Sequence, residues 1–181
     1  MSQTAKDLSI NRAISFYKQG RVKKSLKETL NAKKNYPDEP FIYNLLGVLY
    51  AHIGSFQKST ANYSKAIKLN PKYFEAYNNA GVAYTSWKKN DKAIKCFDRA
   101  IQINPLYPEA YNNKGNALKE KGEYKLAAES YEKSIDLNPN YIDPIANAGI
   151  VYDIMNDFNK AESYFNRALS LNPTNTSLQY N

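Results

Sequence analysis

The chain has 181 residues, of which 43% are hydrophobic, a single cysteine and a formal net charge of +8. One cysteine excludes an internal disulfide framework, and no apolar run approaches the roughly 20 residues that a membrane helix needs. The first seven residues, Met1 to Asp7, contain no apolar signal region. We therefore expect a cytoplasmic protein without a transmembrane segment.

Sequence features return every 34 residues along the chain. A proline closes each unit, and a glycine lies in the first half of four of the five units. The prolines are Pro37, Pro71, Pro105, Pro139 and Pro173, and the glycines are Gly47, Gly81, Gly115 and Gly149. This period divides the chain into repeats at residues 6–39, 40–73, 74–107, 108–141 and 142–175, followed by a tail at residues 176–181.

Each repeat is predicted to form two helices, as the third repeat illustrates. Its first half places apolar or small residues at i, i+3, i+4 and i+7, which is one face of a helix. Its second half repeats that spacing from Ala93 to Ile101. Polar residues at Lys88–Asp91 predict the turn, and Pro105 ends the second helix because proline has no N–H to donate.

Three glycines are expected in the turns between paired helices, at Gly20, Gly54 and Gly122. A left-handed backbone there has little steric cost for glycine. Asn156 occupies the equivalent position in the last repeat, where asparagine is tolerated. Lys88 occupies it in the third repeat and departs from the pattern.

The pattern of an aromatic residue, Leu-Gly, Tyr, Ala, Phe and Pro at a period of 34 resembles the tetratricopeptide repeat family over residues 6–175. The resemblance implies an all-α fold, a right-handed α-solenoid of five helix-turn-helix repeats that forms a single array over residues 1–181. Two short helices cannot bury enough apolar surface alone, so neighbouring repeats must stack.

Residues suited to catalysis or metal binding are scarce. His52 and Cys96 lie in different repeats, and neither has a second imidazole or thiol at ligand spacing. Cys96 beside Phe97 is typical of a half-buried apolar position. We therefore predict a protein that is not an enzyme and that has no metal and no cofactor.

By the same resemblance, the first helix of each repeat lines a concave groove. The stripe opposite its packed face contains Val82 and Ser86 in repeat three, and Ile150 and Ile154 in repeat five. The candidate peptide-binding residues are Asn11, Lys18, Asn44, His52, Glu75, Asn78, Asn79, Glu109, Asn112, Asn113, Asn116, Glu120, Asp143 and Asn147, with an apolar patch of Phe41, Leu45 and Val48.

Four of these residues form an asparagine ladder at one repeat position: Asn11, Asn79, Asn113 and Asn147, with a gap at Leu45. An asparagine side chain both donates and accepts, so a ladder can pair with successive amides of an extended peptide. The array is similar to the asparagine-lined superhelix of the O-linked N-acetylglucosamine transferase family, without its catalytic domain. The alternative is that asparagine merely keeps an exposed face soluble.

Acidic residues dominate the stripe and predict the partner's charge. Four share one repeat position, Asp7, Glu75, Glu109 and Asp143, where a carboxylate in the first helical turn is also explained by the helix dipole. With Glu120, the stripe contains five carboxylates and only one basic residue, Lys18. We expect an extended protein or peptide segment that is polar to basic. The basic clamp with which chaperone co-factors of this family bind acidic tails is absent.

Two other functions remain open. Net charge falls from +5 in residues 6–39 to −2 in residues 142–175, and residues 174–181 have too little apolar periodicity for a capping helix. A head-to-tail scaffold would then cover Tyr164, Phe165 and Ala168 with another molecule, unless the chain is a fragment. Alternatively, the basic first two repeats bind RNA or an anionic membrane. The 16 tyrosines lie largely at packing positions, which argues against nucleic acid.

Overall fold

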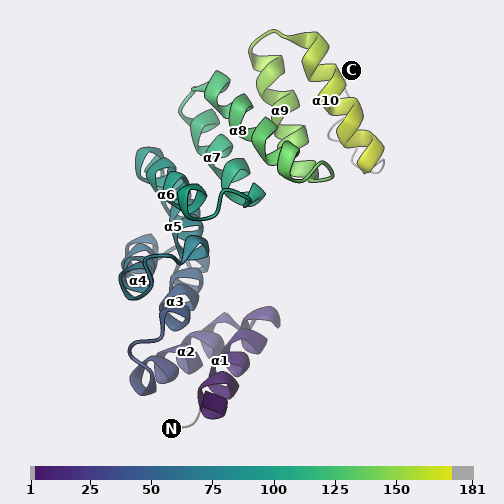
Figure 1. The fold of residues 1–181 in the computed structure, drawn as a ribbon. Coiled ribbons are helices and arrows are strands. Elements are labelled where there is room, and N and C mark those ends of the chain that lie inside the picture. Colours follow the sequence, from purple (N-terminus) through teal and green to yellow (C-terminus); the bar gives the residue numbers. More distant parts are fainter. Residues whose placement is uncertain (1–2, 173–181) are drawn as a thin grey trace. The chain divides into compact units, whose positions relative to one another are not determined.

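The structure is a computed structural model that describes residues 3–172, and it is all-α over that range (Figure 1). In chain order, its ten helices in these residues are α1 (Gln3–Lys18), α2 (Val22–Asn35), α3 (Pro40–His52), α4 (Phe56–Leu69), α5 (Phe74–Ser86), α6 (Asn90–Ile103), α7 (Pro108–Glu120), α8 (Tyr124–Leu137), α9 (Ile142–Ile154) and α10 (Phe158–Leu171). The tail at residues 176–181 lies outside the described residues.

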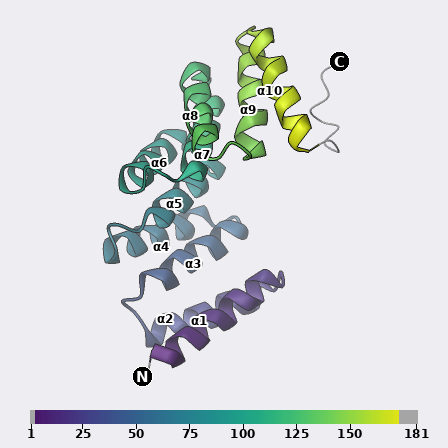
Figure 2. The same cartoon turned by 45° about the vertical axis from the view of Figure 1, so that its right-hand side comes forward.

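The helices belong to two compact units. Unit 1 ends at Trp87 and contains α1–α5, and unit 2 begins at Lys88 and contains α6–α10. Within each unit every helix packs on the next one along the chain (Figure 2). In addition, α3 contacts α5 and α7 contacts α9, so the first helices of neighbouring repeats lie side by side.

The predicted helix pair is present in every repeat, and only the turn of the third repeat is shorter than expected. α6 begins at Asn90, so Asn90 and Asp91 belong to the helix and not to the turn. An acidic residue is favoured in a first turn because it complements the positive end of the helix dipole. Asp91 therefore lies in the first turn of a helix where polarity alone suggested a loop.

The turns adopt the left-handed backbone that the glycine pattern predicted. Gly54 and Gly122 have φ angles of 73° and 79° and no atom near the position of a Cβ. Lys88 and Asn156 adopt the same conformation, with φ of 58° and 60°. A side chain at such a position is strained, so Lys88 meets the geometry of the turn at an energetic cost that glycine avoids.

Glycines in the first helices allow aromatic rings of the second helices to approach the backbone. A Cβ added to Gly115 would lie 2.5 Å from Cε1 of Tyr131, and one added to Gly149 would lie 2.7 Å from Cε1 of Phe165. Tyr131 is completely buried. The glycine column therefore marks the contact between the two helices of a repeat, as the spacing predicted.

In unit 1 a serine hydroxyl makes a second contact between paired helices. Ser25 Oγ donates to the carbonyl oxygen of Ala13, and Ser59 Oγ donates to that of Gly47, each over 2.8 Å. Both serines are fully buried. A buried hydroxyl needs such a partner, so these bonds allow serine at a position that is alanine in the last three repeats.

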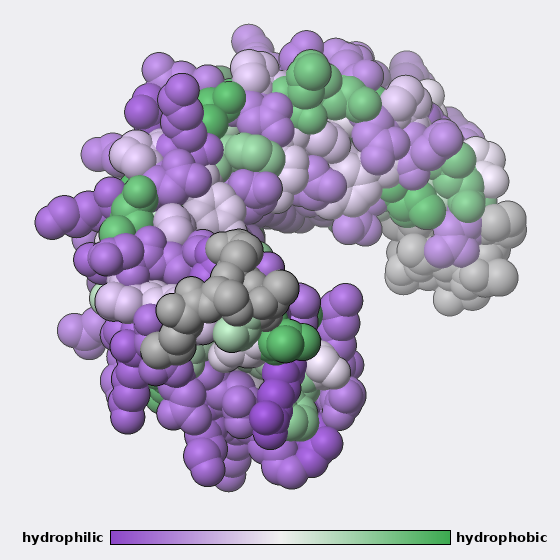
Figure 3. Space-filling model, turned by 60° about the horizontal axis from the view of Figure 1, so that its bottom comes forward, coloured by the Kyte–Doolittle hydropathy of each residue, from purple (hydrophilic) through white to green (hydrophobic). Residues whose placement is uncertain are grey.

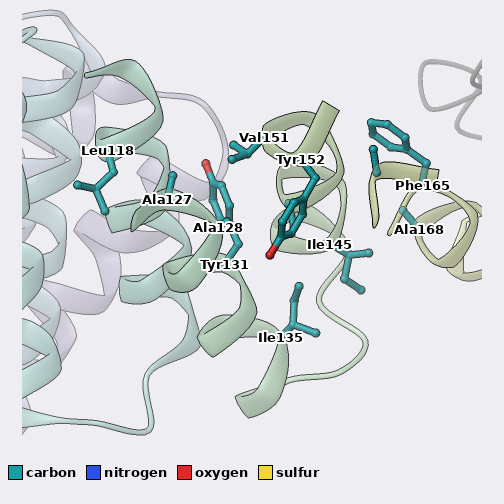
Figure 4. Packing of buried hydrophobic residues seen from close by; sticks show 12 residues of the cluster. Leu118, Ala127, Ala128, Tyr131, Ile135, Ile145, Val151, Tyr152, Phe165 and Ala168 are labelled. Atoms are coloured by element: carbon teal, nitrogen blue, oxygen red, sulfur yellow. The ribbon is translucent and has the colours of Figure 1, made fainter. Parts of the chain in front are cut away.

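The main core of unit 2 lies between α7, α8, α9 and α10. Leu118, Tyr131, Ile145, Val151 and Phe165 are among its buried members (Figure 4). Unit 1 has smaller clusters, including one around Ala13 and Leu49 between α1 and α3. No helix in residues 3–172 is both long and apolar enough to cross a membrane.

Candidate functional site

The candidate residues that are not buried define a ladder face on each unit. Figure 3 shows one side of the molecule, on which hydrophilic side chains predominate and apolar ones form separate patches. The ladder face of unit 1 comprises Asp7, Asn11, Lys18, Phe41, Val48, His52, Glu75, Asn79 and Val82, and that of unit 2 comprises Glu109, Asn113, Asn116, Glu120, Asp143, Asn147, Ile150 and Ile154. These residues come from α1, α3 and α5, and from α7 and α9, respectively.

A pocket of about 230 Å³ opens on the ladder face of unit 1. The predicted residues Val48, His52 and Asn79 line it, together with the stripe residues Val82 and Ser86. Its other lining residues were not predicted from the sequence: Tyr17, Ala51, Phe56, Tyr63 and Ala83. The pocket combines apolar walls with an amide and an imidazole, a mixed lining that is common in ligand pockets.

Tyr17 has a defined position in this pocket. Its ring meets the ring of His52 edge-to-face, with 5.8 Å between the centroids. This arrangement is favourable for aromatic pairs. The pair joins α1 to α3, so a residue of repeat one shapes a pocket formed mainly by repeats two and three.

Three predicted asparagines are buried instead of facing outward, and two of them, Asn44 and Asn112, bond to ladder amides. Asn44, Asn78 and Asn112 are only 8%, 5% and 4% exposed. Asn79 Nδ2 donates to Asn44 Oδ1 over 3.2 Å, and Asn147 Nδ2 donates to Asn112 Oδ1 over 3.4 Å. Because the first helices of neighbouring repeats touch, the buried amide of one repeat holds the ladder amide of the next.

In unit 2 a lysine that the sequence did not indicate joins the ladder. Lys119 Nζ donates to Asn147 Oδ1 over 3.0 Å. Burial lowers the pKa of this lysine, and the nearby Glu120 carboxylate opposes that effect. Lys119 is the only basic residue at its repeat position, since Tyr17, Ala51, Thr85 and Asp153 occupy the others. This difference from the other four repeats was the only feature of the sequence that could have indicated Lys119 as a site residue.

Two further ladder-face residues of unit 2 have partners inside the unit. Tyr131 donates from its hydroxyl to Asn116 Oδ1 over 2.8 Å. Glu120 accepts from Lys88 Nζ over 3.2 Å and from Asn90 Nδ2 over 3.3 Å. Glu120 therefore holds the turn before α6 and is less available to a partner than the sequence suggested.

The acidic position of the stripe agrees with the helix-dipole explanation in three repeats. Glu75, Glu109 and Asp143 lie in the first turns of α5, α7 and α9. Asp7 does not, because α1 begins at Gln3. Dipole stabilisation therefore does not explain Asp7, whose side chain is exposed on the second turn.

The predicted apolar patch is smaller than expected. Leu45 is 7% exposed and packs in the cluster with Ala13 and Leu49. Phe41 is 36% exposed and Val48 is half-buried. The gap in the ladder at Leu45 is thus a core position between α1 and α3, and two residues of the patch remain for contact.

The residues expected to be covered by a second molecule are used within unit 2. Phe165 and Ala168 are 8% and 0% exposed, and Tyr164 stacks on Tyr152 with 5.6 Å between ring centroids. Phe165 and Ala168 are therefore not available for the expected head-to-tail contact, because α10 packs them inside unit 2, whereas Tyr164 is half-buried. The head-to-tail scaffold itself stays a prediction.

His52 lies in unit 1 and Cys96 lies in unit 2. Burial raises the pKa of the Cys96 thiol to about 11, which keeps it protonated and unreactive at neutral pH. Among residues 3–172 no group of three or more His, Cys, Asp and Glu side chains is placed to hold a metal ion.

The repeats, their turns and the glycine contacts identify the class of protein. The family model for the tetratricopeptide repeat matches residues 74–107, 108–141 and 146–175, and a related TPR repeat model matches residues 53–86. These matches cover more than half of the chain. The chain belongs to the tetratricopeptide repeat family, whose fold class is an all-α solenoid of helix-turn-helix repeats.

Solved structures with the same fold include MamA, PilF and YrrB. MamA is 25% identical, with a TM-score of 0.80 over 91% of this chain and 96% of that chain. Pseudomonas aeruginosa PilF is 19% identical, with a TM-score of 0.88 over 97% and 80%. YrrB, described as a TPR protein with an unusual peptide-binding site, is 18% identical, with a TM-score of 0.74 over 94% and 88%.

PilF and YrrB are similar in fold alone, given their low identity. No curated protein matches the sequence.

Proposed function

We propose that this protein is a non-catalytic interaction scaffold that binds an extended polypeptide segment on its ladder faces. The observation that carries the proposal is the pocket of about 230 Å³ in unit 1, where Asn79 lies beside the apolar Val48 and Val82. An amide can pair with a peptide group of any sequence, while the apolar walls select a side chain. The family is one of protein-binding scaffolds, and YrrB is itself described as binding a peptide.

The charges on the two ladder faces support a polar to basic partner. In unit 1 two carboxylates lie on the ladder face, the exposed Asp7 and the half-buried Glu75. The lysine on this face is Lys18, which is also exposed. In unit 2 Glu109 and Asp143 are exposed, while Lys119 is engaged by Asn147. A basic segment gains from these carboxylates, whereas an acidic one is repelled, and both effects weaken with salt.

The proposal predicts an apolar anchor residue within that segment. Val82 is 42% exposed beside Val48 in the pocket wall. A pocket of this volume holds one medium-sized side chain, such as leucine or valine. The preferred ligand is therefore an extended peptide with one aliphatic residue flanked by polar or basic residues.

A peptide array probed with the intact chain tests this function. Selection of sequences with an aliphatic anchor and flanking basic residues supports the proposal, and selection of Asp/Glu-rich sequences contradicts it. Val82→Lys places a charge in the pocket wall and should weaken the best peptide at least about tenfold. Ile53→Lys is the matched control, because Ile53 is 50% exposed and does not line the pocket.

A further inference from the structure

A larger pocket in unit 2 lies away from the ladder face. It has a volume of about 630 Å³ and lies between α6, α7 and α8, with Ile94, Leu118 and Leu126 as apolar lining and Ser130 at its side. Leu126 is 50% exposed and Leu118 is 3% exposed. On α7, Leu118 lies about 140° around the helix axis from Asn113. The volume falls in the range of roughly 300–1,000 Å³ that ligand pockets occupy.

One repeat further along the chain, two tyrosine rings fill the equivalent space. The residues 34 positions after Leu118 and Ser130 are Tyr152 and Tyr164, respectively. The rings of Tyr152 and Tyr164 stack with an interplanar angle of 4°. Both hydroxyls donate to Glu132 Oε1, over 2.6 Å and 3.1 Å. Figure 4 shows Leu118 on α7 and Tyr152 on α9 in these corresponding positions.

A cation accompanies the ring in the filled sites. Lys160, which is equivalent to Leu126, lies 4.5 Å from the ring centroid of Tyr152. In unit 1, Lys58 lies 5.6 Å from that of Tyr50. Four of the five repeats have an aromatic residue and a lysine at these two positions, and the fourth repeat has two leucines. The pocket therefore lies in the one repeat whose sequence lacks both the ring and the cation at these positions.

The rim of the pocket is held by ion pairs. Lys114 Nζ lies 2.7 Å from Asp98 Oδ1, and Lys121 Nζ lies 2.8 Å from Asp91 Oδ1 and 2.6 Å from Glu123 Oε1. Asp98 is one repeat before Glu132, the acceptor of the two tyrosine hydroxyls. A carboxylate has lone pairs for several donors, so Asp98 can accept a phenol O–H while it remains paired with Lys114.

We propose that this pocket is a docking site for a tyrosine side chain of a partner polypeptide. Tyr152 and Tyr164 are the template for the occupant, since the same backbone arrangement one repeat later encloses phenol rings with a carboxylate acceptor. In the α6–α8 pocket the ring would lie on Leu118 and Leu126, and its hydroxyl would reach Asp98. The site is separate from the ladder face and does not depend on the function proposed for it.

N-acetyl-L-tyrosinamide is a suitable chemical probe for this site. Titration into the ¹⁵N-labelled full-length chain should shift the amide signals of α6, α7 and α8 around Leu118 and Ser130, with a dissociation constant on the order of 1 mM. N-acetyl-L-phenylalaninamide should bind more weakly, because it has no hydroxyl for Asp98. N-acetyl-L-leucinamide should bind at least about fivefold more weakly than the tyrosine derivative.

Two substitutions copy the filled site into the pocket. Leu118→Tyr with Ser130→Tyr should lower the affinity for the probe at least about tenfold, while far-ultraviolet circular dichroism remains that of the native chain. Leu106→Tyr is the matched control, since Leu106 is 76% exposed and lies outside the pocket. If the double variant fails to fold, Leu126→Glu changes an exposed wall residue and should still weaken binding.

Three results would overturn the proposal. The first is the absence of saturable shifts up to about 10 mM probe. The second is a set of shifts centred on the ladder face at Asn113 and Asn147 instead of α6–α8. The third is equal affinity in the wild-type chain and in a folded variant with a filled pocket.

Discussion

Asn79 on α5 donates its side-chain amide to Asn44 on α3 over 3.2 Å, and the pair joins a half-buried residue of the ladder to a buried one. Asn147 and Asn112 repeat this contact in unit 2 over 3.4 Å. One amide of each pair is therefore used to orient the other. Some of the donors of the ladder asparagines are thus already bonded within the fold.

Replacement of the buried asparagine tests how much the amide pair stabilises the fold. Asn44→Ala removes the acceptor for Asn79 and should lower the free energy of unfolding by about 0.5–1.5 kcal/mol, the usual contribution of a hydrogen bond. Chemical denaturation measures this loss. Combination with Asn79→Ala should add less than the sum of the two single losses, because both variants remove the same bond. Full additivity would show that the bond does not contribute.

The close contact of Gly115 with Tyr131 predicts sensitivity to a single methyl group. Gly115→Ala forces a Cβ against a fully buried ring and should lower the free energy of unfolding by about 1–3 kcal/mol. Thermal melts check this prediction. The loss should be smaller when the background already carries Tyr131→Leu. An unchanged melting temperature for Gly115→Ala would mean that these helices are not packed as described.

Backbone conformation predicts opposite responses at two equivalent turns. Gly122→Ala should destabilise the chain by about 1 kcal/mol, because alanine is strained at positive φ. Asn156→Gly should be neutral or slightly stabilising, because it relieves strain at a φ of 60°. Denaturant unfolding of the two variants measures both effects. Equal destabilisation by the two would contradict the left-handed assignment.

The Cys96 thiol should react slowly in the folded protein. Its pKa of about 11 against an ordinary value of 9.0 reduces the thiolate fraction about a hundredfold near pH 8. Iodoacetamide labelling of the native and urea-unfolded chains, followed by mass spectrometry, gives the comparison. Equal rates would refute the burial of Cys96.

The same shift has a consequence for stability. The folded chain holds this proton more tightly than the unfolded chain does, so the contribution is present below pH 9 and is lost as pH rises from 9 toward 11.

The repeat pattern was sufficient to predict the secondary structure. Gly54, Gly122 and Asn156 marked the turns, Pro105 marked a helix end, and Gly115 marked a helix contact. These features depend on contacts within one repeat, between residues that are close in the sequence. The extent of the array as one domain over residues 1–181 remains a prediction.

The site was less predictable, because it depends on contacts between repeats. A helical wheel placed Leu45 on the open face, although α1 covers it and makes it part of the core. It also could not distinguish Asn44 from Asn79, which are one step apart in repeat position but differ in burial. Lys119 reaches the ladder only because α7 and α9 touch, and no periodicity within one repeat contains that information.

The most direct test of the central claim is the affinity of the best array-selected peptide, labelled with a fluorophore, for two variants of the full chain. One variant carries Asn79→Ala, Asn113→Ala and Asn147→Ala on the ladder faces, and the other carries Asn44→Ala and Asn112→Ala at the buried partners. Fluorescence anisotropy should show a loss of at least about tenfold in the first and no more than about threefold in the second. A ladder variant that binds as tightly as the wild-type chain, with its fold intact, would contradict the account.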